Sequence, residues 1–133
     1  MTLTDLPTGA YLAWRYGDSH RSIDRAQIYW DDGRVEALEG GARDEVCRFD
    51  AAQVERARQA IVDSGLPAAA ERSRGVTTYD TAAITYWWRL DTRVGQFLNS
   101  AYPVEQPVEI DRLEAALAEL EEAAGGWPLS ADE

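Results

Sequence analysis

The pattern of apolar and polar residues predicts a strand most clearly at residues 81–90, which contain two of the five tryptophans. Successive side chains of a strand point to opposite faces of a sheet. One face of this run carries the apolar residues Ile84, Tyr86, Trp88 and Leu90. The other face carries Thr85, Trp87 and Arg89. We expect the apolar face to pack in the core, so that any function of the strand belongs to the mixed face.

Further strands are indicated at residues 10–16, 27–30, 34–38 and 96–99, with a short edge strand at 46–49. In the first of these, Leu12, Trp14 and Tyr16 alternate with Tyr11 and Arg15, so the two sets belong to opposite faces. Residues 31–33, Asp-Asp-Gly, separate the second and third strands. The Asp-Gly pair tolerates the positive φ angles of a type I′ turn, which predicts a hairpin at this point.

A helix over residues 51–63 is marked at both ends. Asp50 can cap its N-terminus, and Gln53 completes a capping box. Gly65 suits the left-handed position that follows a helix, and Pro67 blocks continuation, so residues 68–75 are interpreted as a linker or a frayed turn.

A second helix is predicted from about Asp111 to residue 124. Its apolar stripe consists of Leu113, Ala116, Leu117, Leu120 and Ala124. The acidic residues Glu119, Glu121 and Glu122 fall mostly away from that stripe.

The predicted order is strand, strand, strand, helix, strand, strand, helix. Hairpins without a parallel crossover favour an antiparallel sheet of about five strands with both helices on one face, which is an α+β fold. The length of 133 residues is typical of one domain. We therefore treat residues 1–133 as a single globular domain with a short flexible tail at about 125–133.

Composition is that of an ordinary globular protein and favours the cytoplasm. No apolar run approaches the roughly 18 residues of a membrane span. Residues 1–7 lack the basic and apolar regions of a secretory signal. A single cysteine, Cys47, cannot form an internal disulfide, which favours a reducing compartment.

Negative charge is concentrated towards the end of the chain. The net charge is −11, and residues 105–133, with nine acids and one arginine, contribute −8 of it. Such a field attracts basic partners and opposes binding of nucleic acid. An acidic helix surface that only keeps the protein soluble is the simpler explanation.

No arrangement of residues predicts catalysis, a metal site or a cofactor. His20 is the only histidine and lies in a polar loop, which excludes a histidine-based zinc site. Cys47 has no adjacent base, and Asp31 and Asp32 lie in a turn that already requires such residues. A glycine-rich phosphate loop is not present in the sequence.

The remaining candidate is the second face of the sheet. If the hairpins keep their parity, this face gathers aromatic rings and arginines, from which binding platforms are built. The residues predicted to bind there are Tyr11, Arg15, Tyr29, Trp87 and Arg89, with Gln27 and Thr85 beside them. Alternatively, this face packs against the loop at residues 17–25, the C-terminal tail or a second subunit.

Three functions fit these observations. The first is a non-enzymatic interaction domain, such as an inhibitor, immunity or regulatory protein, that binds a protein partner through this sheet face and the acidic C-terminal helix. The second is a binder of small molecules or carbohydrates, or a minor enzyme, with a pocket between sheet and helices lined by Trp14, Trp30, Tyr86 and Trp88. The third is a homodimer formed through the same sheet face. Nucleic acid and membranes are not expected partners.

The layout of residues 50–124 is similar to that of the emfourin-type inhibitors of metalloproteases. The shared features are a helix that ends in Ser-Gly-Leu-Pro (residues 64–67), a Tyr-rich hairpin, and a Pro-led helix with Leu113, Leu117 and Leu120. The resemblance concerns the order of elements. It implies an inhibitor and assigns no functional residue.

Overall fold

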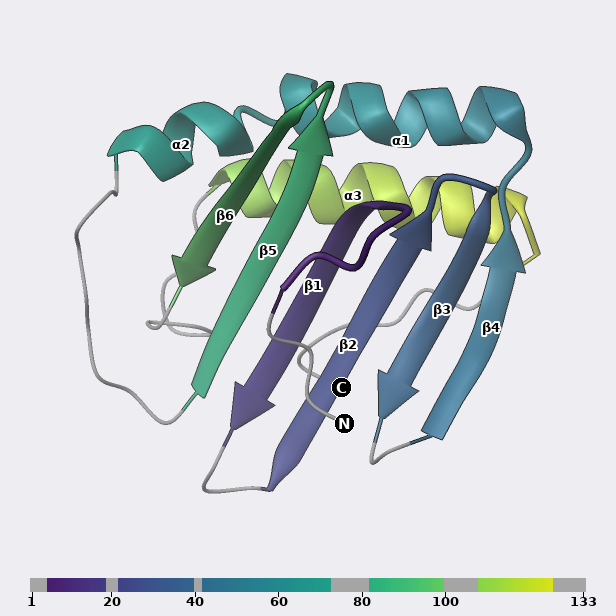
Figure 1. The fold of residues 1–133 in the computed structure, drawn as a ribbon, viewed down its shortest axis with the longest axis horizontal. Helices are drawn as coiled ribbons and strands as arrows, with labels where there is room; N and C mark the ends of the chain where they lie inside the picture. Colours follow the sequence, from purple (N-terminus) through teal and green to yellow (C-terminus); the bar gives the residue numbers. More distant parts are fainter. Residues whose placement is uncertain (1–4, 19–21, 40–41, 73–81, 100–107, 126–133) are drawn as a thin grey trace.

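A computed structural model describes residues 5–18, 22–39, 42–72, 82–99 and 108–125. Its centre is one antiparallel sheet of six strands in the order β4-β3-β2-β1-β5-β6 (Figure 1). The strands are β1 (Ala10–Asp18), β2 (Ile23–Trp30), β3 (Arg34–Glu39), β4 (Ala42–Arg48), β5 (Ala82–Leu90) and β6 (Arg93–Asn99). The predicted α+β fold is confirmed. The sheet has six strands instead of about five because β4 is a full strand.

The helices all lie against one face of the sheet (Figure 1). They are α1 (Ala51–Asp63), α2 (Leu66–Arg72) and α3 (Val108–Ala123). α1 has the predicted capping box, in which the Asp50 side chain accepts from the Gln53 backbone at 2.8 Å and the Gln53 side chain accepts from the Asp50 backbone at 2.9 Å. α2 replaces the predicted linker, because Pro67 lies in its first turn, where the missing N–H leaves no bond unmade.

The main core lies between the sheet and the helices. β1 contributes Leu12, Trp14 and Tyr16, and β5 contributes Ile84, Tyr86 and Trp88, each at most 4% exposed. The helices add Val54, Ala57, Ile61, Ile110, Leu113, Leu117 and Leu120. The predicted core face of β5 is therefore confirmed. Gly95 of β6 lies against the Trp88 ring, and a Cβ at this position would overlap the indole.

The predicted parity is wrong at three positions of β1 and β2. Trp14 pairs with Gln27 and Leu12 pairs with Tyr29, so Gln27 and Tyr29 lie on the helix-covered face. A register irregularity between Ala10 and Leu12 brings Tyr11 to the same face, where it packs beside Tyr29. Both faces of β2 carry apolar or aromatic residues, and alternation alone does not distinguish them.

The face of the sheet that none of the three described helices covers is called the open face. It holds a second apolar cluster, made of Ala10, Ala13, Ala26, Ile28, Leu38 and Trp87, with Leu6 and Trp30 packed against it. Trp87 pairs with Ala13 and is 5% exposed. Trp87, one of the predicted binding residues, therefore belongs to a packed layer and offers little exposed surface to a partner.

Candidate functional site

A buried polar cluster lies where the last turn of α3 packs on β2. Glu121 is 3% exposed and accepts a hydrogen bond from the side-chain amide of Gln27. The same amide donates to the hydroxyl of Tyr29 at 2.8 Å. The Oε1 atom of Gln27 and the hydroxyl of Tyr11 are buried, and neither has a hydrogen-bond partner among the described residues. Helical spacing predicts Glu121 outside the apolar stripe, and the structure instead buries it.

Burial shifts the titration of this cluster. Loss of solvation raises the pKa of Glu121 from 4.5 to about 7, although hydrogen bonds from Gln27 and Tyr29 oppose the shift. Burial, and then the charge of Glu121, raises the pKa of Tyr29 well above its ordinary value. Burial likewise raises the pKa of the Cys47 thiol to about 11, so this thiol is protonated at neutral pH. Glu121 is the member of the cluster that titrates near neutral pH.

Asp31 joins the turn after β2 to two other elements. Its carboxylate binds Arg89 of β5 at 2.6 Å and Arg58 of α1 at 2.6 Å. The Arg58 guanidinium also lies 5.3 Å from the centre of the Tyr11 ring. Arg89, one of the predicted binding residues, is therefore already engaged by a carboxylate.

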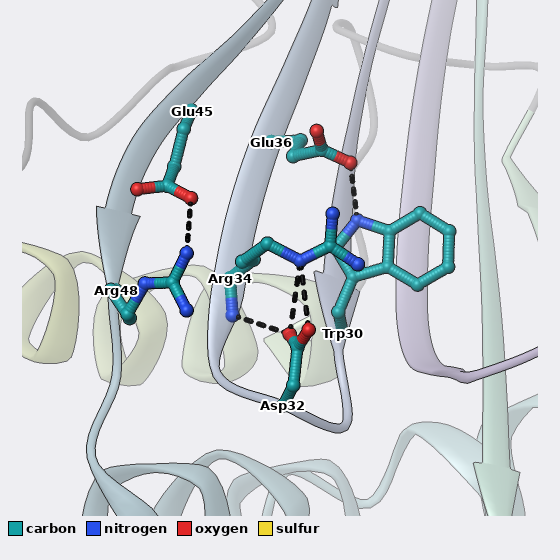
Figure 2. Close-up of polar contacts among 6 residues, drawn as sticks. All are labelled: Trp30, Asp32, Arg34, Glu36, Glu45 and Arg48. Atoms are coloured by element: carbon teal, nitrogen blue, oxygen red, sulfur yellow. Dashed lines mark hydrogen bonds and ion pairs between the residues drawn. The ribbon is translucent and has the colours of Figure 1, made fainter.

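The β2–β3 hairpin carries polar contacts on the open face (Figure 2). The indole N–H of Trp30 donates to Glu36 at 2.5 Å, and the Arg34 guanidinium lies 5.1 Å from the centre of the Trp30 ring. Asp32 accepts from the backbone and the side chain of Arg34, and the backbone hydrogen bond is the largest cause that lowers the pKa of Asp32. These contacts stabilise the predicted hairpin. Its turn is not of the predicted type I′, because Gly33 has a positive φ but the central residues Asp31 and Asp32 do not.

The side chains of β6 form an exposed and partly apolar part of the open face. Val94, Gln96 and Leu98 alternate along this strand, and we call them the β6 strip. Val94 is 60% exposed, Leu98 is 49% exposed, and Gln96 between them is also exposed. In the described part of the chain β6 pairs only with β5, so its outer edge carries unpaired backbone groups there (Figure 1).

A groove of about 430 Å³ lies in the helical layer between α1 and α3. It is lined by Arg56, Gln59, Ala60, Asp63, Ser64, Arg112 and Ala116. This groove differs from the predicted pocket between sheet and helices, whose expected lining is divided between two clusters. Trp14, Tyr86 and Trp88 fill the core, and Trp30 lies on the open face.

The five predicted binding residues do not form one surface. Arg15, Trp87 and Arg89 belong to the open face, whereas Tyr11 and Tyr29 lie in the core. Arg15 pairs with Asp24 at 2.9 Å. The β6 strip was not predicted, although the uncharged run at residues 94–99 was an available signal.

The described residues include no group of three or more His, Cys, Asp and Glu side chains that could hold a metal ion. His20 lies outside the described residues. Within those same segments, no helix combines the length and apolar character needed to cross a membrane.

Comparisons with known proteins assign no family to this chain. No protein-family model matches it, and no curated protein matches it either. The similarity of layout to emfourin-type inhibitors therefore stays a prediction.

Proposed function

We propose that this protein is a non-enzymatic interaction domain of the cytoplasm that binds a protein partner through β6 and the adjoining part of the open face. The supporting observation is the β6 strip, in which two large apolar side chains are exposed on a strand at the edge of the described sheet. Exposed edges recruit further strands by main-chain hydrogen bonds, and alternate side chains then give specificity. The strip combines both features.

Two arginines give this surface a polar border. Arg89 pairs across the sheet with Val94, and Arg15 is paired with Thr85 one strand further in. Their side chains are 28% and 33% exposed, and each is partly neutralised by an aspartate. Protein interfaces commonly have such an apolar centre with a polar rim.

The acidic helix α3 lies in the helical layer, whereas the β6 strip lies on the open face (Figure 1). The sheet face and the acidic helix that were predicted to bind one partner therefore lie on different sides of the sheet. The exposed acids of α3, Asp111, Glu119 and Glu122, lie in the helical layer (Figure 1). We expect them to act on a partner at the β6 strip through their field, which attracts basic proteins, repels acidic ones and weakens as salt is raised.

Differential capture tests this proposal. Tagged wild-type protein and a Leu98→Glu variant serve as baits in a native lysate that also contains a second copy of this chain with a different tag. Val62→Glu is the matched control, because Val62 is 50% exposed on α1, in the other layer. We expect wild type and Val62→Glu to recover the same proteins and Leu98→Glu to lose them. Equal recovery by Leu98→Glu, or no recovery by wild type, would contradict the proposal.

A further inference from the structure

The two edges of the described sheet are built differently. β4 carries four charged residues in its seven positions, and its pairing with β3 has a register shift between Val35 and Glu36. Charges and bulges are the devices by which proteins prevent an edge strand from pairing with another chain. β6 has an unbroken register with β5, from the Leu90–Arg93 pair to the Ile84–Asn99 pair, and no charged residue from 94 to 99. Among the described residues, charges and a register shift are therefore present at β4 and absent from residues 94–99 of β6, although α2 packs against β6 in the helical layer.

The β6 strip is also complementary to itself. Val94 and Leu98 lie two positions to either side of Gln96 on the same face of the strand. When two such strands pair antiparallel about a two-fold axis at Gln96, Val94 of each copy lies opposite Leu98 of the other. The two Gln96 side chains then face each other. Apolar and amide pairs of this kind stabilise antiparallel strands, and a two-fold interface requires this self-complementarity.

We propose that the partner of β6 is a second copy of this chain, paired antiparallel about Gln96 so that the two sheets form one continuous sheet. This inference rests on the proposed interaction function and names the partner for the β6 strip. The two-fold axis is perpendicular to the plane of the sheet. The helical layers of the two copies therefore lie on the same side of the continuous sheet. The main chain supplies hydrogen bonds, and the Val94–Leu98 pairs supply apolar burial.

The charge of the chain predicts how this dimer responds to salt. Each copy carries a net charge of −11, so the copies repel one another at long range, while the strip itself is neutral. Screening weakens that repulsion, and the dimer should therefore become tighter as salt is raised. A complex with a basic partner has the opposite salt dependence.

A pair of charge variants at Gln96 tests both the dimer and its register. Gln96→Lys and Gln96→Glu each place like charges opposite each other at the two-fold axis, and Gln96 is exposed, so neither change disturbs packing within one copy. Sedimentation velocity from micromolar to millimolar protein should show wild-type dimer, and each variant alone should dissociate about tenfold more readily. An equimolar mixture of the two variants should recover the dimer. Thr92→Lys, exposed in the turn before β6, is the control and should behave as wild type.

The outcomes separate this inference from the proposed function. Monomeric wild type at all concentrations overturns the dimer, as does a dimer that weakens with salt. A dimer that is unaffected by either Gln96 variant overturns the pairing about Gln96. If Leu98-dependent capture brings down another protein while wild type sediments as a monomer, the interaction function stands and the second copy is the wrong partner.

Discussion

The side-chain amide of Gln27, in β2, donates a hydrogen bond to the carboxylate of Glu121, in the last turn of α3. Both side chains are buried, and the described residues around Glu121 are the amide, two tyrosines and a thiol instead of a cation. A carboxylate in such a place is disfavoured when it is charged. Burial of the Glu121 carboxylate therefore links the stability of the fold to pH.

The contribution of Glu121 to the free energy of unfolding should fall as pH rises from about 4.5 to 7. The folded-state pKa of Glu121, about 7, lies above its ordinary value of 4.5, so the folded state binds more protons within that window. The free energy of unfolding should decrease by about 3 kcal/mol across it. Urea denaturation of wild type and Glu121→Gln at several pH values measures the effect. The two proteins should be similar near pH 4, and Glu121→Gln should be the more stable above pH 7.

The control for this titration is Glu122→Gln, because Glu122 is the exposed neighbour of Glu121 on the same helix. This variant should keep the wild-type pH dependence. A pH profile of Glu121→Gln that parallels wild type would show that Glu121 is not the group responsible.

Replacement of either central tryptophan of β5 should be costly. Trp88 is 4% exposed in the main core, and Trp88→Ala should lower the free energy of unfolding by about 3–5 kcal/mol. Trp87 is 5% exposed in the cluster of the open face, so Trp87→Ala should cost an amount of the same order. Chemical denaturation of the two variants makes the comparison. A Trp87→Ala variant as stable as wild type would mean that the open-face cluster contributes no stability.

Asp31→Asn should destabilise the protein only slightly. Asp31 binds Arg58 and Arg89, but its side chain is 38% exposed, and ion pairs in contact with water contribute at most about 1 kcal/mol each. The loss should shrink further in high salt. Denaturation midpoints at low and high salt test this, and a loss independent of salt would show that the pair acts through packing.

Gly33→Ala should lower the free energy of unfolding by about 1–3 kcal/mol or more, because it strains the β2–β3 hairpin. Gly33 has a φ of +99°, and a Cβ there would overlap the carbonyl oxygen of Phe49. The overlap would also disturb the 2.7 Å hydrogen bond from the Phe49 backbone to the Gly33 carbonyl. Thermal unfolding of the variant measures the cost. Gly125→Ala is a useful comparison, since Gly125 also has a positive φ, of 82°, but no atom of the described residues lies within 4 Å of an added Cβ.

Features of the fold with complete local signals were predictable from the sequence. The bounds predicted for α1 agree with those in the structure, because its N-terminal cap, its apolar stripe and its terminating glycine are all local signals. The position of the β2–β3 hairpin, though not its turn type, and the core face of β5 are further examples. In each case the residues that determine the structure are neighbours in the chain.

The candidate site was less predictable because it depends on pairings between distant segments. The irregularity at Ala10 and Leu12 moves Tyr11 to the core, and the β1–β2 register does the same to Tyr29. The burial of Glu121 depends on which strand α3 packs against, and helical spacing alone does not give that information. The β6 strip lies in a run of residues without charge, which is visible in the sequence. Its value as a binding surface depends on β6 being the outermost described strand, which the sequence does not show.

Hydrogen exchange at the backbone amides of β6, measured as a function of protein concentration, tests the central claim most directly. Exchange at an edge strand is slowed when a second copy pairs with it, because its outward N–H groups then donate hydrogen bonds. We predict that alternate amides of residues 94–98 gain protection as concentration rises, while the amides of β4 do not. Protection of β6 that is the same at every concentration would contradict the account.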